Sequence, residues 1–139
     1  MKNIFQVRAL NTKASTGLLL FRIVVGLAFM FHGWGKIQNP MNWMGESGPP
    51  AILQLLAAIS EFGGGLAWIL GLLFPLSSLG IFFTMGFATY FHAFIKGDPF
   101  VGHEGSFEPA LVYMMTALLF ILTGPGKFSL DSKIFGTKN

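Results

Sequence analysis

Four long apolar runs alternate with short polar segments along the chain, and this pattern predicts four membrane-spanning helices. The runs cover about residues 16–37, 50–74, 75–95 and 107–123. A helix crosses about 30 Å of hydrocarbon with roughly 20 apolar residues, so each run has about the required length. Helix-breaking residues flank the runs: Asn39-Pro40 after the first, Gly48-Pro49-Pro50 before the second and Gly124-Pro125-Gly126 after the fourth. Only the Phe74-Pro75-Leu76-Ser77 segment divides the second run from the third, which predicts a tight antiparallel hairpin.

The charges agree with a membrane protein and orient it. Only 11% of the 139 residues are charged and 53% are hydrophobic, whereas soluble domains are roughly 25% charged. Six of the nine Lys and Arg residues lie beside the termini, and two, Lys36 and Lys96, lie on the other side. Because Lys and Arg collect on the cytoplasmic side of membrane proteins, we expect the N- and C-termini to be cytoplasmic. The apolar runs predict one all-α domain over residues 1–139, an integral membrane four-helix transmembrane bundle.

The basic ends then face membrane lipid, whose anionic headgroups attract them, and no nucleic-acid partner is expected. The chain has no cysteine, which excludes disulfides, thiolate metal sites and a dithiol redox relay within the chain. Gly63, Ala67 and Gly71 are spaced four apart. Such a small-residue face serves close helix packing inside the bundle or, alternatively, a homo-oligomer.

Two opposite charges interrupt the first two runs. Arg22 lies more than a turn inside the first predicted helix, on one face with Gly26, Gly33 and Lys36. Glu61 lies near the middle of the second, at a depth that differs from that of Arg22 by roughly 5 Å. Because a lone charge in a span is costly, we expect an Arg22–Glu61 ion pair. It either fixes helix packing alone or also tunes a site.

Histidines form a second polar group near the opposite ends of the spans. His32 and His92 belong to the first and third predicted helices, which run in the same direction, so they should lie at similar depth. Lys36 follows His32 by one turn, and the next loop adds Asp98, His103, Glu104 and Glu108. Imidazole can donate to a quinone carbonyl, relay protons or bind a metal. Each histidine could equally hydrogen-bond a neighbouring backbone or hydroxyl group, and the sequence leaves both interpretations open.

Four segments, in this order and spacing, resemble the DoxX family: 17–22 (GLLLFR), 31–36 (FHGWGK), 61–64 (EFGG) and 124–131 (GPGKFSLD). The resemblance implies a four-helix, multi-pass protein of the bacterial or archaeal cytoplasmic (inner) membrane, associated with oxidoreductase complexes. The related DoxD branch is associated with thiosulfate:quinone oxidoreductase. By this resemblance Arg22, His32, Lys36 and Glu61 form the polar core.

We therefore expect an integral membrane subunit of a redox system. A quinone near the outer face would meet His32, Lys36 and His92 as catalytic groups, and Glu61 and Arg22 would complete its binding site. Electrons would come from a soluble or membrane oxidoreductase subunit or a bound cofactor. Two alternatives remain: a haem or metal held by His32 and His92, and a non-catalytic membrane anchor or assembly subunit. The sequence does not decide whether the chain is itself catalytic.

Overall fold

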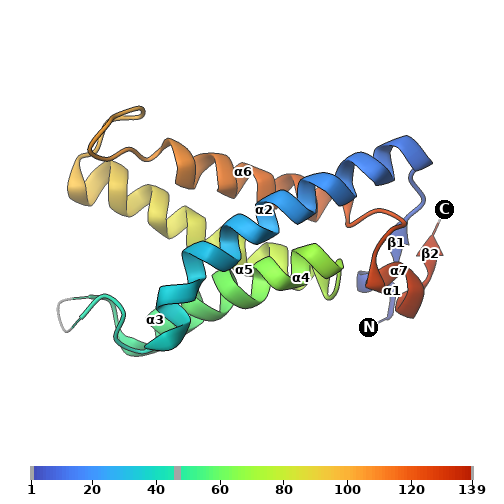
Figure 1. The fold of residues 1–139 in the computed structure, drawn as a ribbon, viewed down its shortest axis with the longest axis horizontal. Helices are drawn as coiled ribbons and strands as arrows, with labels where there is room; N and C mark the ends of the chain where they lie inside the picture. The colour runs from blue at the N-terminus through green and yellow to red at the C-terminus, as the bar shows by residue number, and fades with distance from the viewer. Residues whose placement is uncertain (1, 46–47, 139) are drawn as a thin grey trace.

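The structure, a computed structural model, describes residues 2–45 and 48–138. Four apolar helical segments make up the bundle (Figure 1). They are α2 (Thr12–Gln38), the composite α3 (Ala51–Ala58), η1 (Ile59–Gly63) and α4 (Gly64–Leu70), the composite α5 (Phe74–Tyr90) and η2 (Phe91–Lys96), and α6 (Glu108–Thr123). The two η elements are π-helical turns. α2 packs on α4 and η1, while α6 packs on α5.

A small terminal module, which the sequence pattern did not reveal, closes one end of the bundle. It contains α1 (Lys2–Phe5), β1 (Val7–Arg8), α7 (Leu130–Phe135) and β2 (Thr137–Lys138), and the two strands pair in parallel. Both termini lie in this module, beside the start of α2 and the end of α6 (Figure 1). The expectation that the two termini share one end of the bundle is therefore confirmed.

The helices agree with the predicted apolar runs, with one boundary corrected. Three segments, Thr12–Gln38, Ala51–Leu70 and Phe74–Lys96, are long and apolar enough to cross a membrane, and Glu108–Thr123 is apolar but shorter. The second helix was expected to reach residue 74, yet it ends at Leu70. Gly71 follows at φ +64° and Leu73 at φ +47°, and these left-handed conformations end the helix and turn the chain.

The surface of this bundle differs from that of a soluble protein. Large apolar side chains face outward, including Phe31 at 80% exposure and Phe94 at 75%. Arg22, Glu61 and Asp131 are buried, with at most 2% exposure. This distribution suits a molecule whose surroundings are hydrocarbon, where charged groups must turn toward the interior and find partners.

Glycines let the first two segments cross at close range. A Cβ on Gly65 would lie 2.6 Å from the carbonyl oxygen of Gly26, and a Cβ on Gly26 would lie 2.7 Å from that of Gly65. Small residues at such a crossing allow backbone-to-backbone packing. By contrast, a Cβ on Gly63 would meet just one atom, 3.8 Å away on Ile59. Gly65, and not Gly63 of the predicted small-residue face, therefore packs directly against the backbone of α2.

Arg22 closes the end of the bundle beside the terminal module. Its guanidinium is fully buried and donates to the carbonyls of Trp68 (2.8 Å) and Ile69 (3.0 Å), in the last turn of α4. It also donates to the carbonyls of Pro125 (2.5 Å) and Phe128 (3.1 Å), in the segment after α6. The last carbonyls of a helix have no partner within the helix and carry its negative dipole end. The Arg22 guanidinium therefore supplies the missing hydrogen-bond donors and also places a positive charge at the negative end of the helix dipole.

Asp131 caps the N-terminus of α5. Its two carboxylate oxygens accept from the backbone N–H groups of Leu73 and Phe74, each at 2.8 Å. These are free donors at a helix N-terminus, where the dipole favours negative charge. Arg22 and Asp131 thus satisfy the two open helix ends at the α4–α5 turn, and both ends would otherwise lack partners in the bilayer.

The expected Arg22–Glu61 ion pair is wrong. Arg22 uses its donors on carbonyl groups, and within the described residues Glu61 pairs with Lys36 instead. The register of the helices explains the difference. Arg22 lies level with Ile69, eight residues and about 12 Å beyond Glu61 at 1.5 Å per residue.

We predict that Gly65→Ala lowers the unfolding midpoint in mild detergent, because the added methyl group must displace the backbone of α2. Overpacking of this kind costs about 1–3 kcal/mol. Gly63→Ala is the matched control, since its methyl group has room, and it should leave the midpoint unchanged or raise it. Equal midpoints for the two variants would contradict the close crossing.

We also predict that Asp131→Asn destabilises the protein by about 1–3 kcal/mol, the cost of leaving a buried donor unpaired. The amide presents one acceptor oxygen, so one of the two N–H groups at residues 73 and 74 loses its partner. Lys133→Gln, an exposed change two residues away on α7, should have little effect in the same thermal measurement. A wild-type midpoint for Asp131→Asn would show that the α5 end does not need the carboxylate.

Candidate functional site

A cavity of about 500 Å³ lies between α3–η1 and α5–η2. α3 and the C-terminal part of the α5–η2 segment lie at the end of the bundle away from the termini (Figure 1). Its walls are mainly apolar, with Leu53 and Leu56 on one side and Phe83, Phe87 and Phe91 on the other. A few polar side chains also line it: Lys36, Ser60, Glu61, Thr84 and His92. An apolar pocket with few polar groups is the usual form of a small-molecule site.

Lys36 and Glu61 form an ion pair in the wall of this cavity. The ammonium group of Lys36, in the last turn of α2, donates to both carboxylate oxygens of Glu61, at 2.5 and 2.6 Å. Glu61 is 2% exposed and belongs to the π-helical turn η1. Such wide turns are frequent at functional sites. The glycines that follow Glu61 adopt the wider turn easily because they have no Cβ. The pair removes the large cost of leaving either charge alone in the bundle.

The loop after α2 folds over Lys36. The Trp43 ring lies 4.4 Å from the Lys36 ammonium, a cation–π contact. The indole N–H donates to the carbonyl of Gln54, and the Gln54 side chain in turn bonds the backbone of Met44 and Pro49. Gln54 therefore fastens the loop to α3 and holds Trp43 in the cavity wall.

His92 enters the cavity from the other side. It lies in the π-helical turn η2, and its Nδ1 is 2.6 Å from a carboxylate oxygen of Asp98. The chain turns at Gly97, with φ +71°, and this turn brings Asp98 back toward the ring. A carboxylate at Nδ1 fixes which nitrogen of a neutral imidazole carries the proton. Nε2 then remains as an acceptor, and it has no hydrogen-bond partner among residues 2–45 and 48–138.

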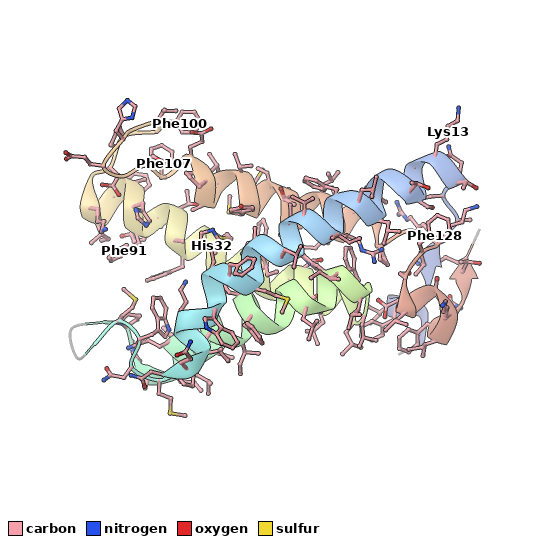
Figure 2. The ribbon with its side chains drawn as sticks, viewed as in Figure 1. Lys13, His32, Phe91, Phe100, Phe107 and Phe128 are labelled. Atoms are coloured by element: carbon pink, nitrogen blue, oxygen red, sulfur yellow. The ribbon has the colours of Figure 1, made fainter. Side chains whose placement is uncertain are left out.

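The other predicted residues lie elsewhere. His32 is exposed on α2 and does not line the cavity; its ring makes an edge contact with Tyr113 of α6, with centroids 6.2 Å apart. In the view of Figure 2, His32 is separated from Phe91 of the cavity wall. Arg22 belongs to the opposite end of the bundle, and His103 and Glu104 are exposed in the loop before α6. Within the described ranges, no three His, Asp or Glu side chains gather as a metal site would require.

The structure thus joins Lys36, Glu61 and His92 around one cavity and leaves Arg22 and His32 outside it. Sequence analysis did not place Trp43 or Gln54 at the site, and it did not pair His92 with Asp98. The short His92–Asp98 spacing across a glycine was a usable signal for that pair, since it suits a turn that returns the carboxylate to the ring. The chemistry available is a fixed hydrogen-bond donor and an imidazole acceptor facing an apolar space.

Comparison with known proteins gives consistent results. The sequence model of the DoxX family matches residues 17–93. Inner membrane protein YqjF of Escherichia coli (strain K12) is 36% identical over 120 residues, which cover 83% of this chain and 89% of the relative. Inner membrane protein YphA of the same organism is 30% identical, over 84% of this chain and 89% of the relative. A Bacillus subtilis (strain 168) protein named "Putative oxidoreductase CatD" is 30% identical, over 94% and 96%.

No solved structure matches the chain. The apolar helices and the two inner membrane relatives identify a multi-pass protein of the bacterial inner membrane. The family match covers more than half of the sequence and includes Arg22, His32, Lys36 and Glu61. The chain belongs to the DoxX family.

Proposed function

We propose that this protein is a subunit of a membrane redox system and binds a quinone in the cavity between α3–η1 and α5–η2. The observation that carries the proposal is the Lys36–Glu61 ion pair and one imidazole, His92, in a mainly apolar cavity of a membrane protein. A quinone combines a planar head bearing two oxygens with a lipid-soluble tail. Its head requires few polar partners, and its tail requires an apolar path.

The shape of the cavity fits this ligand class. Its volume of about 500 Å³ is within the usual range for small-molecule pockets, about 300–1,000 Å³. Leu56 and Phe83 line the cavity and keep 52% and 66% of their surface exposed. Exposed apolar side chains in the wall suit a cavity that opens between α3 and α5 toward the bilayer. A head could enter from the hydrocarbon and leave its tail among lipid chains.

Lys36 would hold one oxygen of the head. An ammonium group has three N–H donors, and Glu61 accepts two hydrogen bonds from it. One donor remains for a ligand oxygen. Glu61 and Trp43 fix the position of the ammonium group before any ligand arrives, which lowers the entropy cost of binding.

His92 would act on another oxygen of the head. With Asp98 at Nδ1, Nε2 of the neutral ring accepts a hydrogen bond or a proton from a ligand hydroxyl. Asp98 then stabilises the imidazolium that forms, as a carboxylate does in other histidine–carboxylate pairs. Asp98 belongs to the loop after η2 and its side chain is 20% exposed. A proton held at His92 is therefore close to the aqueous surface.

The redox assignment rests on more than the cavity. A bound quinone supplies two-electron chemistry coupled to proton transfer. Because the chain contains no cysteine to exchange electrons with the quinone, a partner oxidoreductase would exchange them. The name of the Bacillus subtilis relative points in the same direction. The His32–His92 haem alternative has less support, because His32 lies outside the cavity that His92 lines.

The membrane topology completes the proposal. α6, with 16 residues, would be the fourth span; it measures about 24 Å, and local thinning of the bilayer accommodates a short span at modest cost. The basic terminal module would face the cytoplasm. The quinone head would then bind near the outer face of the membrane, where Lys36 and His92 lie.

We predict that Ala57→Phe, which fills the cavity from α3, lowers binding of a short-tail benzoquinone by at least about tenfold, or roughly 1.4 kcal/mol. His92→Ala and the double change Lys36→Met/Glu61→Met should also weaken binding. The double change removes both charges together, so that neither is left buried and unpaired. Binding is measured in detergent as the ratio of extracted quinone to protein after equilibration and separation.

His32→Ala is the matched control: it removes an imidazole at the same end of the bundle but outside the cavity, and it should retain wild-type binding. The unfolding midpoint of each variant is measured beside its binding ratio, so that loss of binding is distinguished from loss of folding. Wild-type binding in a folded Ala57→Phe protein would refute the cavity as the quinone site. Absence of binding by the wild type, with partner activity unchanged by the cavity variants, would favour the anchor function instead.

A further inference from the structure

The terminal module holds two cations side by side. β1 and β2 pair in parallel with Val7 opposite Thr137 and Arg8 opposite Lys138. Residues opposite one another in a parallel pair point to the same face, and neighbouring strands lie about 4.8 Å apart. Arg8 and Lys138 therefore carry their positive charges on the same face of the strand pair. The strands β1 and β2 lie together although they come from opposite ends of the chain (Figure 1).

Both cations line a second, smaller cavity of about 170 Å³ at the terminal end of the bundle. The rest of the lining includes the apolar side chains of Phe5 in α1, Pro75 at the start of α5, and Ile121 and Leu122 at the end of α6. Cationic groups thus meet apolar side chains at the ends of membrane helices. This is the level at which a lipid changes from headgroup to acyl chain.

The sequence provides almost no negative charge to balance this pair. Across residues 1–35, 62–97 and 109–139, Asp131 is the single acidic residue. Asp131 is fully buried, and both of its oxygens accept from backbone N–H groups of the α4–α5 turn. Arg8 donates to the carbonyl of Leu122 at 3.3 Å, which leaves most of its guanidinium donors for another partner. Adjacent like charges repel, and an external anion would remove that repulsion.

We propose that this cavity binds the phosphate of an anionic phospholipid headgroup. A guanidinium fork and an ammonium group are the usual partners of a phosphate, and the neighbouring side chains of Pro75 and Leu122 suit the first carbons of the acyl chains. The site does not depend on quinone binding, because it lies at the other end of the bundle from Lys36 and His92. Since the bound lipid would contact both β1 and β2, it would hold the two ends of the chain together.

The test uses the full-length protein in zwitterionic detergent micelles with added phosphatidylglycerol or phosphatidylcholine. Native mass spectrometry counts bound lipid, and the unfolding midpoint is recorded for the same samples. Phosphatidylglycerol should bind the wild-type protein and raise its midpoint, and phosphatidylcholine should do neither. Arg8→Gln/Lys138→Gln should reduce the phosphatidylglycerol adduct about tenfold, through loss of charge-assisted hydrogen bonds.

Lys13→Gln/Lys133→Gln is the matched control. It removes two positive charges from exposed positions at the same end, outside the cavity lining, so a nonspecific charge effect would be equal in the two double variants. Equal loss of lipid from both would overturn the proposal. An equal rise in midpoint with inorganic phosphate alone would also overturn it, because the ligand would then be a free phosphate and not a lipid.

Discussion

The buried guanidinium of Arg22 is the constraint on which the rest of the structure depends. The α4–α5 turn is short, so it leaves the last carbonyls of one helix and the first N–H groups of the next without partners at the membrane surface. Arg22 donates to those carbonyls and to the segment after α6, and Asp131 accepts from the N–H groups. These two residues bring α2, the hairpin and the C-terminal segment to a fixed arrangement, and this arrangement sets how far α2 slides along its neighbour.

That register determines where the remaining charges meet. With Arg22 beside Ile69 and Gly26 against Gly65, Lys36 reaches Glu61 fourteen residues along α2, about 21 Å from Arg22. The charged residues that the family resemblance suggests as a single polar core therefore divide into two groups. One group closes the helix ends beside the terminal module, and the other forms part of a cavity wall at the opposite end. The two π-helical turns lie at this second group and carry Glu61 and His92.

The sequence predicted the helices well because their signal is local. Apolar runs, flanking prolines and glycines, and the inward face of α2 all follow from spacing along the chain. Partners across the bundle depend on rotation and register, which spacing does not contain, and the Arg22–Glu61 expectation failed for that reason. An ideal helical period also misplaces residues near η1, since a π turn inserts extra chain that hydropathy does not reveal. The terminal module was missed because its strands have two residues each and pair across almost the whole chain.

The central claim is that the ligand site uses Lys36, Glu61 and His92, separate from the Arg22 and Asp131 contacts and from His32. Photolabelling of the protein in native membranes with an azido-substituted quinone, followed by peptide mapping, tests it directly. We predict adducts within residues 53–61 and 80–92, which supply the cavity walls, and loss of these adducts when unlabelled quinone competes. Competable adducts concentrated at His32 and Tyr113, or beside Arg22, would contradict the account.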